Sequence, residues 1–151
     1  SLADVRELLM HFRTRTNEED VTSAVRTTLR KFEHQAGLKT HLSVQGDGLP
    51  LPADVQVQVL HVVQEALSNV RKHAQAREVW VEIEQSPQWR VEVRDDGCGF
   101  EDKQPDETHV GLRIMNERAR AIHATVDVTS VAGSGTCVVL TLPPRQPRKT
   151  A

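Results

Sequence analysis

The 151-residue chain has few cysteines, little net charge and no long apolar run, and each shortage excludes a class of protein. Its two cysteines, Cys98 and Cys137, have neither the spacing of a metal site nor the number of a disulfide framework, so we expect a reducing compartment. A formal net charge of −2 provides no basic footprint for nucleic acid. No apolar run approaches the roughly 18 residues that cross a bilayer, and no signal-peptide pattern opens the chain, so we expect a soluble piece.

The chain does contain enough apolar sequence for one ordinary core, since 38% of its residues are hydrophobic and 26% are charged. Apolar positions at helical spacing predict helices over about 21–37 and 53–74, and from Gly111 onward. Alternating apolar residues predict half-buried strands around residues 42–44, 79–83, 91–93, 126–128 and 138–142. These patterns indicate an α/β fold, a two-layer sandwich with helices packed on one face of a mixed β-sheet.

The two ends of the chain differ from this domain, which we expect to occupy residues 17–144. An apolar stripe at helical spacing opens the sequence, formed by Val5, Leu8, Leu9 and Phe12. We interpret residues 1–16 as the end of a longer, dimerising helical hairpin. Residues 145–151 contain proline and basic residues, and we expect a disordered tail there.

The expected helix over 53–74 carries an unusual set of polar groups. At roughly 100° per residue, a carboxylate, an amide, an ammonium and an imidazole share one arc, apart from the apolar arc: Glu65, Asn69, Lys72 and His73. Four unlike functional groups on one arc suit a binding or catalytic site. A solvated strip on an amphipathic helix gives the same pattern more often, so the arc alone does not assign one.

A second candidate feature follows an expected strand, in the stretch 95–99. Period-2 alternation places Asp95 on the same face as the apolar residues of that strand, where a carboxylate requires a donor. The amino group of a purine could supply that donor, and Gly97 and Gly99 would let the backbone approach a flat ligand. An ordinary Asp-Asp-Gly turn would show the same residues.

Two further glycine motifs come next in the chain. Gly111 opens an expected helix, where exposed N–H groups and the positive end of the helix dipole could bind phosphate. The polar segment 101–107 before it is of the kind that closes over a ligand, although an ordinary acidic loop has the same composition. A glycine hairpin over 133–136 joins two expected strands, and the Thr136 hydroxyl could reach the same pocket.

In order along the chain, these segments resemble the N, G1, G2 and G3 motifs of the GHKL ATPase/kinase superfamily. The matching residues are Glu65-x-x-x-Asn69-x-x-Lys72-His73, Asp95-x-Gly97-x-Gly99, Gly111-Leu112 and Gly133-x-Gly135-Thr136. Up to about Pro144 the chain is similar to the catalytic ATP-binding domain of bacterial sensor histidine kinases. Shorter stretches resemble nitrate/nitrite sensors of the NarX/NarQ type, among them Ile114-Met115-x-Glu117-Arg118-Ala119. The resemblance implies the Bergerat fold.

The resemblance also implies a chemistry, namely binding of Mg·ATP and transfer of the γ-phosphoryl group to a histidine of a partner domain. Asn69 would coordinate Mg²⁺, and Asp95 would accept a hydrogen bond from the adenine amino group. Glu65 would orient or polarise the nucleophile or the metal shell. The other implied nucleotide-binding positions are Lys72, His73, Gly97, Gly99, Gly111, Leu112, Gly135 and Thr136.

The chain departs from the family pattern at its third motif and in its histidines. Gly111 stands alone where many kinases have a Gly-x-Gly pair, and the segment 101–107 has no phenylalanine-rich motif. The family's phosphoacceptor histidine is followed by an acidic residue. No acidic residue follows the histidines at 11, 34, 41, 61, 109 and 123. We therefore expect a catalytic fragment that does not phosphorylate itself. Residues 1–16 would end the dimerisation and phosphoacceptor hairpin of a homodimeric inner-membrane sensor, with this domain in the cytoplasm and a response regulator downstream.

Three other functions share these motifs. A hydrolytic relative would use Glu65 as general base for water, but it needs transducing domains of which the sequence shows no trace. A serine kinase of the anti-sigma-factor kind lacks the dimerising hairpin that the N-terminal apolar stripe indicates. A degenerate nucleotide-binding module would have lost active residues, and every motif of this chain retains them.

Overall fold

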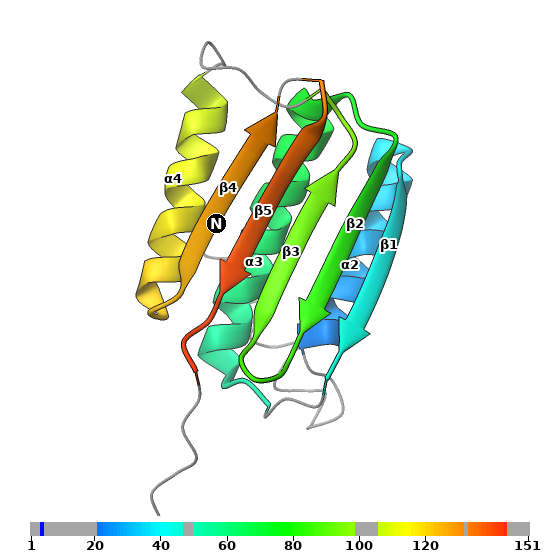
Figure 1. Ribbon diagram of the computed structural model, residues 1–151. Coiled ribbons are helices and arrows are strands. Elements are labelled where there is room, and N and C mark those ends of the chain that lie inside the picture. The colour runs from blue at the N-terminus through cyan, green and yellow to red at the C-terminus, as the bar shows by residue number, and fades with distance from the viewer. Residues whose placement is uncertain (1–3, 5–20, 47–49, 99–105, 132, 145–151) are drawn as a thin grey trace, which may run out of the picture.

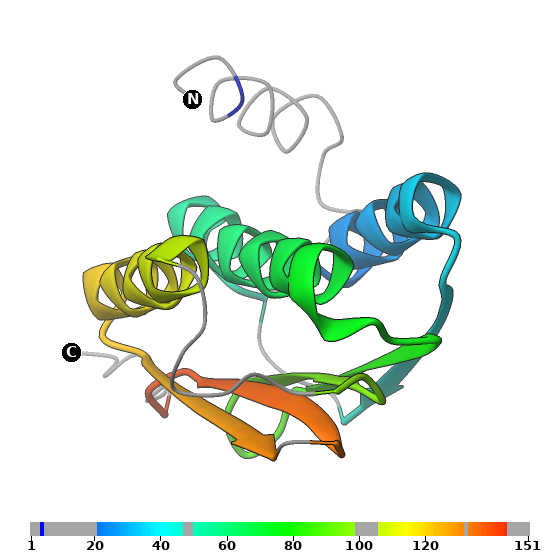
Figure 2. The same cartoon turned by 90° about the horizontal axis from the view of Figure 1, so that it is seen from above.

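The computed structural model describes residue 4 and residues 21–46, 50–98, 106–131 and 133–144. This part contains three α-helices, a π-helical turn and five strands. Their arrangement is shown in Figure 1, and Figure 2 shows the helices as one layer above the sheet. The helices are α2 (Val21–Ala36), α3 (Ala53–Asn69) and α4 (Asp106–Ala121). The strands are β1 (Lys39–Gln45), β2 (Glu78–Glu84), β3 (Arg90–Asp95), β4 (Thr125–Val131) and β5 (Gly135–Thr141). The expected two-layer α/β sandwich is confirmed.

The sheet is mixed, with strand order β1-β2-β3-β5-β4. β1 runs parallel to β2, whereas the other neighbouring strands pair antiparallel. β5 inserts between β3 and β4, so the hairpin of β4 and β5 lies against the central strand. This order places the end of β3, which carries Asp95, beside the start of β5, which carries Thr136.

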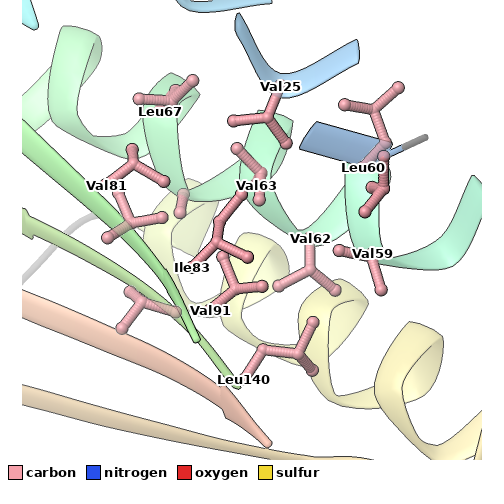
Figure 3. Close-up of a cluster of buried hydrophobic side chains, with 14 of the residues drawn as sticks. Val25, Val59, Leu60, Val62, Val63, Leu67, Val81, Ile83, Val91 and Leu140 are labelled. Atoms are coloured by element: carbon pink, nitrogen blue, oxygen red, sulfur yellow. The ribbon is translucent and has the colours of Figure 1, made fainter. Parts of the chain in front are cut away.

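The core lies between the sheet and the helices. Alternate residues of β2 and β3 are buried on the helix-covered face, as the period-2 pattern predicts: Val79, Val81, Ile83, Val91 and Val93. Figure 3 shows Val81, Ile83 and Val91 facing Val63 of α3, with Leu140 of β5 nearby. Because α3 directs its apolar arc into the sheet, its polar residues are left at the sides of the helix.

Several sequence expectations can be compared directly with this fold. Helix α2 ends at Ala36, and the N–H of Gly37 (φ 70°) donates to the Glu33 carbonyl oxygen at 2.9 Å, which is a glycine C-cap. Cys98 and Cys137 form no disulfide within the described part of the chain. No helix among the described residues is long and apolar enough to span a membrane. The expectations for residues 5–16, Gly99, most of the segment 101–107 and the tail fall outside the described residues.

Candidate functional site

The four motif segments meet at one end of the molecule. In Figure 1 the C-terminal end of α3, the end of β3, the turn between β4 and β5 and the N-terminal end of α4 all lie at the top. These segments are separated by long stretches of sequence and come from both layers of the sandwich. The fold therefore brings the described parts of these four segments to one end of the molecule.

Glu65 and Asn69 lie one turn apart on α3 and contact α4 at Gly111. A Cβ atom added to Gly111 would lie 2.8 Å from Glu65 Oε1 and 3.1 Å from Asn69 Oδ1. A Cβ atom there would make the flexible end of the Glu65 side chain shift, so glycine leaves room for both polar groups beside α4. The structure thus brings together a carboxylate, an amide and a stretch of backbone without a side chain.

The segment after Asn69 corrects the expectation of one regular helix to residue 74. Helix α3 ends at Asn69, and Val70–Ala74 form a π-helical turn, η1. A π-turn is wider than an α-turn, so residues beyond Asn69 no longer follow the 100° spacing that placed four groups on one arc. Lys72 is exposed, and the side chain of His73 lies outside the described part. Such turns occur frequently at functional sites, and a period count cannot detect them.

Gly111 does not open its helix, which corrects a second expectation. Helix α4 begins at Asp106, five residues earlier, so the Gly111 N–H lies beyond the first turn, where N–H groups bond within the helix. The acidic pair Asp106 and Glu107 suits a helix N-terminus and was the signal for this earlier start. Leu112 is half-buried and packs against the hydrophobic core.

Asp95 is 4% exposed at the end of β3, on the helix-covered face that the alternation predicts. Its Oδ1 accepts a hydrogen bond from the N–H of Gly97 at 2.8 Å. Burial raises the pKa of the Asp95 carboxyl above its usual value, although backbone hydrogen bonds from Gly97 and Thr136 oppose the shift. A buried carboxylate at this edge is an acceptor that a ligand with an N–H donor would satisfy.

The turn between β4 and β5 packs directly on the loop that follows β3. Gly135 has φ 98°, and a Cβ atom there would collide with the carbonyl oxygen of Asp95. The N–H of Gly133 donates to the Cys98 carbonyl oxygen at 2.7 Å. The glycine motif therefore forms one wall of the Asp95 environment with its backbone, as well as joining two strands.

Thr136 lies beside Asp95 on the inner face of the sheet. It alternates in register with the buried Val138 and Leu140 and is half-buried. Its Oγ1 lies 3.2 Å from Oγ of Ser130 on the paired strand. The Thr136 hydroxyl therefore lies on the face of the sheet that carries Asp95, and its contact with a ligand stays a prediction.

Asp96 forms a link that the sequence reasoning missed. Its Oδ1 accepts hydrogen bonds from the N–H groups of Arg77 at 2.8 Å and Glu78 at 3.0 Å. The hydrogen bond from Glu78 is the largest cause that lowers the pKa of the Asp96 carboxyl, and that from Arg77 adds to it. No local signal names these partners, because the sheet register brings the start of β2 beside the end of β3.

We predict that Gly135→Ala destabilises the protein more than Gly133→Ala. Both residues have positive φ, but a Cβ atom at Gly133 has nothing within 4 Å, whereas one at Gly135 meets the Asp95 backbone. The expected losses in free energy of unfolding are about 1 kcal/mol for Gly133→Ala and about 2–4 kcal/mol for Gly135→Ala. Urea unfolding measures both, and equal losses would contradict the close contact.

We also predict that Asp95→Asn raises the thermal midpoint of the ligand-free protein at pH 7. The folded-state pKa of Asp95 is raised, so its protonated form favours folding at low pH, and that contribution disappears as the pH rises through the folded pKa. The gain should narrow as the pH falls through the raised pKa of Asp95, because the wild-type carboxyl then becomes protonated as well. The exposed Asp127→Asn serves as control. A lower midpoint for Asp95→Asn at pH 7 would contradict the desolvation argument.

Comparison with known proteins accords with this geometry. Residues 54–146 match the family of histidine kinase-, DNA gyrase B-, and HSP90-like ATPases. The chain is 36% identical over 136 residues to the nitrate/nitrite sensor protein NarQ of Escherichia coli, covering 89% of this chain and 24% of NarQ. It is 32% identical over 147 residues to NarX of the same species, covering 97% of this chain and 25% of NarX.

A solved histidine kinase domain has the same fold. The domain from the blue-light activated histidine kinase of Erythrobacter litoralis EL346 superposes with a TM-score of 0.74 at 22% identity, covering 93% of this chain and 72% of that one. The chain spans about a quarter of the length of NarQ and NarX. It belongs to the histidine kinase-, DNA gyrase B-, and HSP90-like ATPase family, and its resemblance to the ATP-binding domains of sensor histidine kinases of the NarX/NarQ type is confirmed.

Proposed function

We propose that the chain binds Mg·ATP among α3, β3, the β4–β5 turn and α4, and transfers the γ-phosphoryl group to a histidine of another domain. ATP binding belongs to the family, and the assignment of residues is the proposal. The observation that carries it is the position of Asp95. A nearly buried carboxylate lies at the same end of the molecule as Glu65 and Asn69, in a family of ATPases.

Asp95 is proposed to select adenine. A carboxylate offers about four acceptor positions, and backbone groups of Gly97 and Thr136 use only part of this capacity. The amino group of adenine would donate to Asp95, whereas the corresponding oxygen of guanine would face a second acceptor and be rejected. Gly97, Gly99, Gly135 and Thr136 would form the surrounding wall, which matches the backbone packing of the β4–β5 turn on Asp95.

Asn69 is proposed to hold Mg²⁺ together with the phosphates of ATP. No three His, Cys, Asp or Glu side chains cluster as a metal cage in the part of the chain that the structure describes. Mg²⁺ keeps several waters and binds mainly through substrate phosphates, so one amide oxygen beside the Glu65 carboxylate fits an ion that arrives with ATP. The ion would neutralise phosphate charge. Lys72, His73 and the backbone around Gly111 and Leu112 would contribute further phosphate contacts.

Glu65 is proposed to orient the incoming histidine, because it is also reached from outside the molecule. It borders a groove of about 660 Å³ that is lined by residues of the three helices and by Asp4, and the lining includes Gln64 of α3 and Arg118 of α4. An acceptor side chain on another domain could approach Glu65 through this groove while ATP occupies the edge of the sheet. Transfer would then depend mainly on positioning and charge stabilisation.

The remainder of the parent protein belongs to the proposal, since this chain spans about a quarter of NarQ and NarX. Residues 17–144 would form the ATP-binding domain, and residues 1–16 would lead from the dimerisation domain that carries the acceptor histidine. The parent would be a homodimeric membrane sensor with this domain in the cytoplasm. Its phosphohistidine would supply a response regulator.

Calorimetric titration with a non-hydrolysable ATP analogue, with and without Mg²⁺, tests the site. We expect Asn69→Ala to lose most of the Mg-dependent affinity while retaining the fold, because it removes the metal's amide oxygen. Asn116→Ala, which removes an exposed amide on α4, is the matched control and should bind normally.

In the same titration, Asp95→Asn should weaken binding of the ATP analogue by about 1–3 kcal/mol, since it leaves the adenine edge mispaired.

Two results of this titration would refute the assignment. Unchanged Mg-dependent affinity in Asn69→Ala would remove the metal role of Asn69. Equal affinity of the wild type for ATP and GTP analogues would remove the adenine role of Asp95.

A transfer assay tests the reaction itself. Incubated alone with ATP radiolabelled at its γ-phosphate, the chain should remain unlabelled, because none of its histidines precedes an acidic residue. Adding the dimerisation domain of the parent protein should produce acid-labile label on that domain. Self-labelling of the isolated chain, or steady hydrolysis of ATP without an acceptor, would contradict the proposal.

A further inference from the structure

We propose that Asp96 is a positioning residue for nucleotide selection, which ties the loop bearing Asp95 to the start of β2 and thereby holds the adenine acceptor in place. The inference rests on the proposed function, in which Asp95 receives the adenine amino group. Asp96 itself is exposed, whereas Asp95 and Gly97 on either side are buried. Its effect on a nucleotide would therefore act through the position of its neighbours.

The hydrogen bonds of Asp96 connect distant parts of the chain. Its Oδ1 accepts from the N–H groups of Arg77 at 2.8 Å and Glu78 at 3.0 Å, which are 19 and 18 residues away. An aspartate that only forms a turn bonds to backbone two residues further along. Asp95 does that with Gly97, so the two adjacent carboxylates have different tasks.

The link lies where the regular strand pairing stops. The β2–β3 ladder ends with the pair Val79 and Asp95. Beyond it, the N–H of Asp96 reaches the carbonyl oxygen of Glu78 at 3.4 Å, which is a long hydrogen bond. The two shorter bonds to the Asp96 carboxylate therefore supply most of the connection at this point.

The start of β2 is a suitable anchor, because it is held from its other side. The N–H of Lys39 in β1 donates to the Arg77 carbonyl oxygen at 3.3 Å, and β1 pairs with β2 along its whole length. Asp96 thus connects the loop to the sheet. Fixing Asp96 fixes both the buried acceptor Asp95 and its donor Gly97.

The pKa shifts of the two carboxylates agree with a structural role for Asp96 and a ligand-binding role for Asp95. Backbone hydrogen bonds, that to Glu78 first, lower the pKa of Asp96, so the fold stabilises its ionised form. Burial raises the pKa of Asp95. Both donors of the exposed carboxylate belong to the start of β2, so it serves as a structural link, and the buried one retains acceptor capacity for a ligand.

Three substitutions separate geometry from charge. Asp96→Asn keeps an acceptor oxygen at the same position and removes the charge, Asp96→Glu keeps the charge and displaces the oxygen, and Asp96→Ala removes both. The exposed Asp127→Ala on β4 controls for loss of a surface carboxylate. Calorimetry on the whole 151-residue chain would measure affinity for non-hydrolysable ATP and GTP analogues with Mg²⁺, and thermal unfolding would measure stability.

We expect Asp96→Ala and Asp96→Glu to reduce the ratio of ATP to GTP affinity by about tenfold, roughly the effect of one misplaced hydrogen bond. Asp96→Asn and Asp127→Ala should keep that ratio within about threefold of the wild type. A lower midpoint in Asp96→Ala with an unchanged ratio would overturn the inference, because a purely structural link would give that result.

If Asp96→Ala does not fold, the comparison of Asp96→Glu with Asp96→Asn tests the inference. A lower ratio of ATP to GTP affinity in Asp96→Glu than in Asp96→Asn supports the positioning role of Asp96, and equal ratios overturn it. A wild-type protein that binds neither analogue would overturn the proposed function together with this inference. If the wild type binds the ATP analogue selectively and the Asp96 variants keep the same ratio of ATP to GTP affinity, the inference alone is overturned.

Discussion

A carboxylate buried at the end of a central strand imposes the main constraint on this molecule. Only 4% of the surface of Asp95 is exposed to solvent, so its oxygens need hydrogen-bond donors from the fold or from a ligand. The fold supplies backbone N–H groups from the loop after β3 and from the start of β5. The sheet order meets this need, because β5 pairs with β3 and thereby places Thr136 beside Asp95.

Two close backbone approaches surround this carboxylate and the amide of Asn69. Gly135 brings the β4–β5 turn against the Asp95 backbone, and Gly111 brings α4 against Glu65 and Asn69. A methyl group would collide with backbone at Gly135 and would displace the ends of side chains at Gly111. One close approach therefore lies within the helix layer and the other within the sheet, and Figure 1 shows both elements ending at the same end of the molecule.

The candidate site is also where the molecule departs from local rules. Helix α3 widens into a π-turn directly after Asn69, and a carboxylate is buried among apolar strands. Such departures cost stability and persist where surrounding structure supports them. The apolar layer between α3 and the strands, seen in Figure 3, provides that support.

The sequence by itself determined the layers, the inward face of Asp95 and the family, because alternation of valines and helical spacing of apolar residues encode which side of each element is buried. The order of the four motifs carried the resemblance. The tertiary structure decided that α4 begins before Gly111, that the helix widens after Asn69 and that Asp96 pairs with Arg77 and Glu78. These features depend on which backbones come into contact across the fold, and residue periodicity carries no information about such contacts.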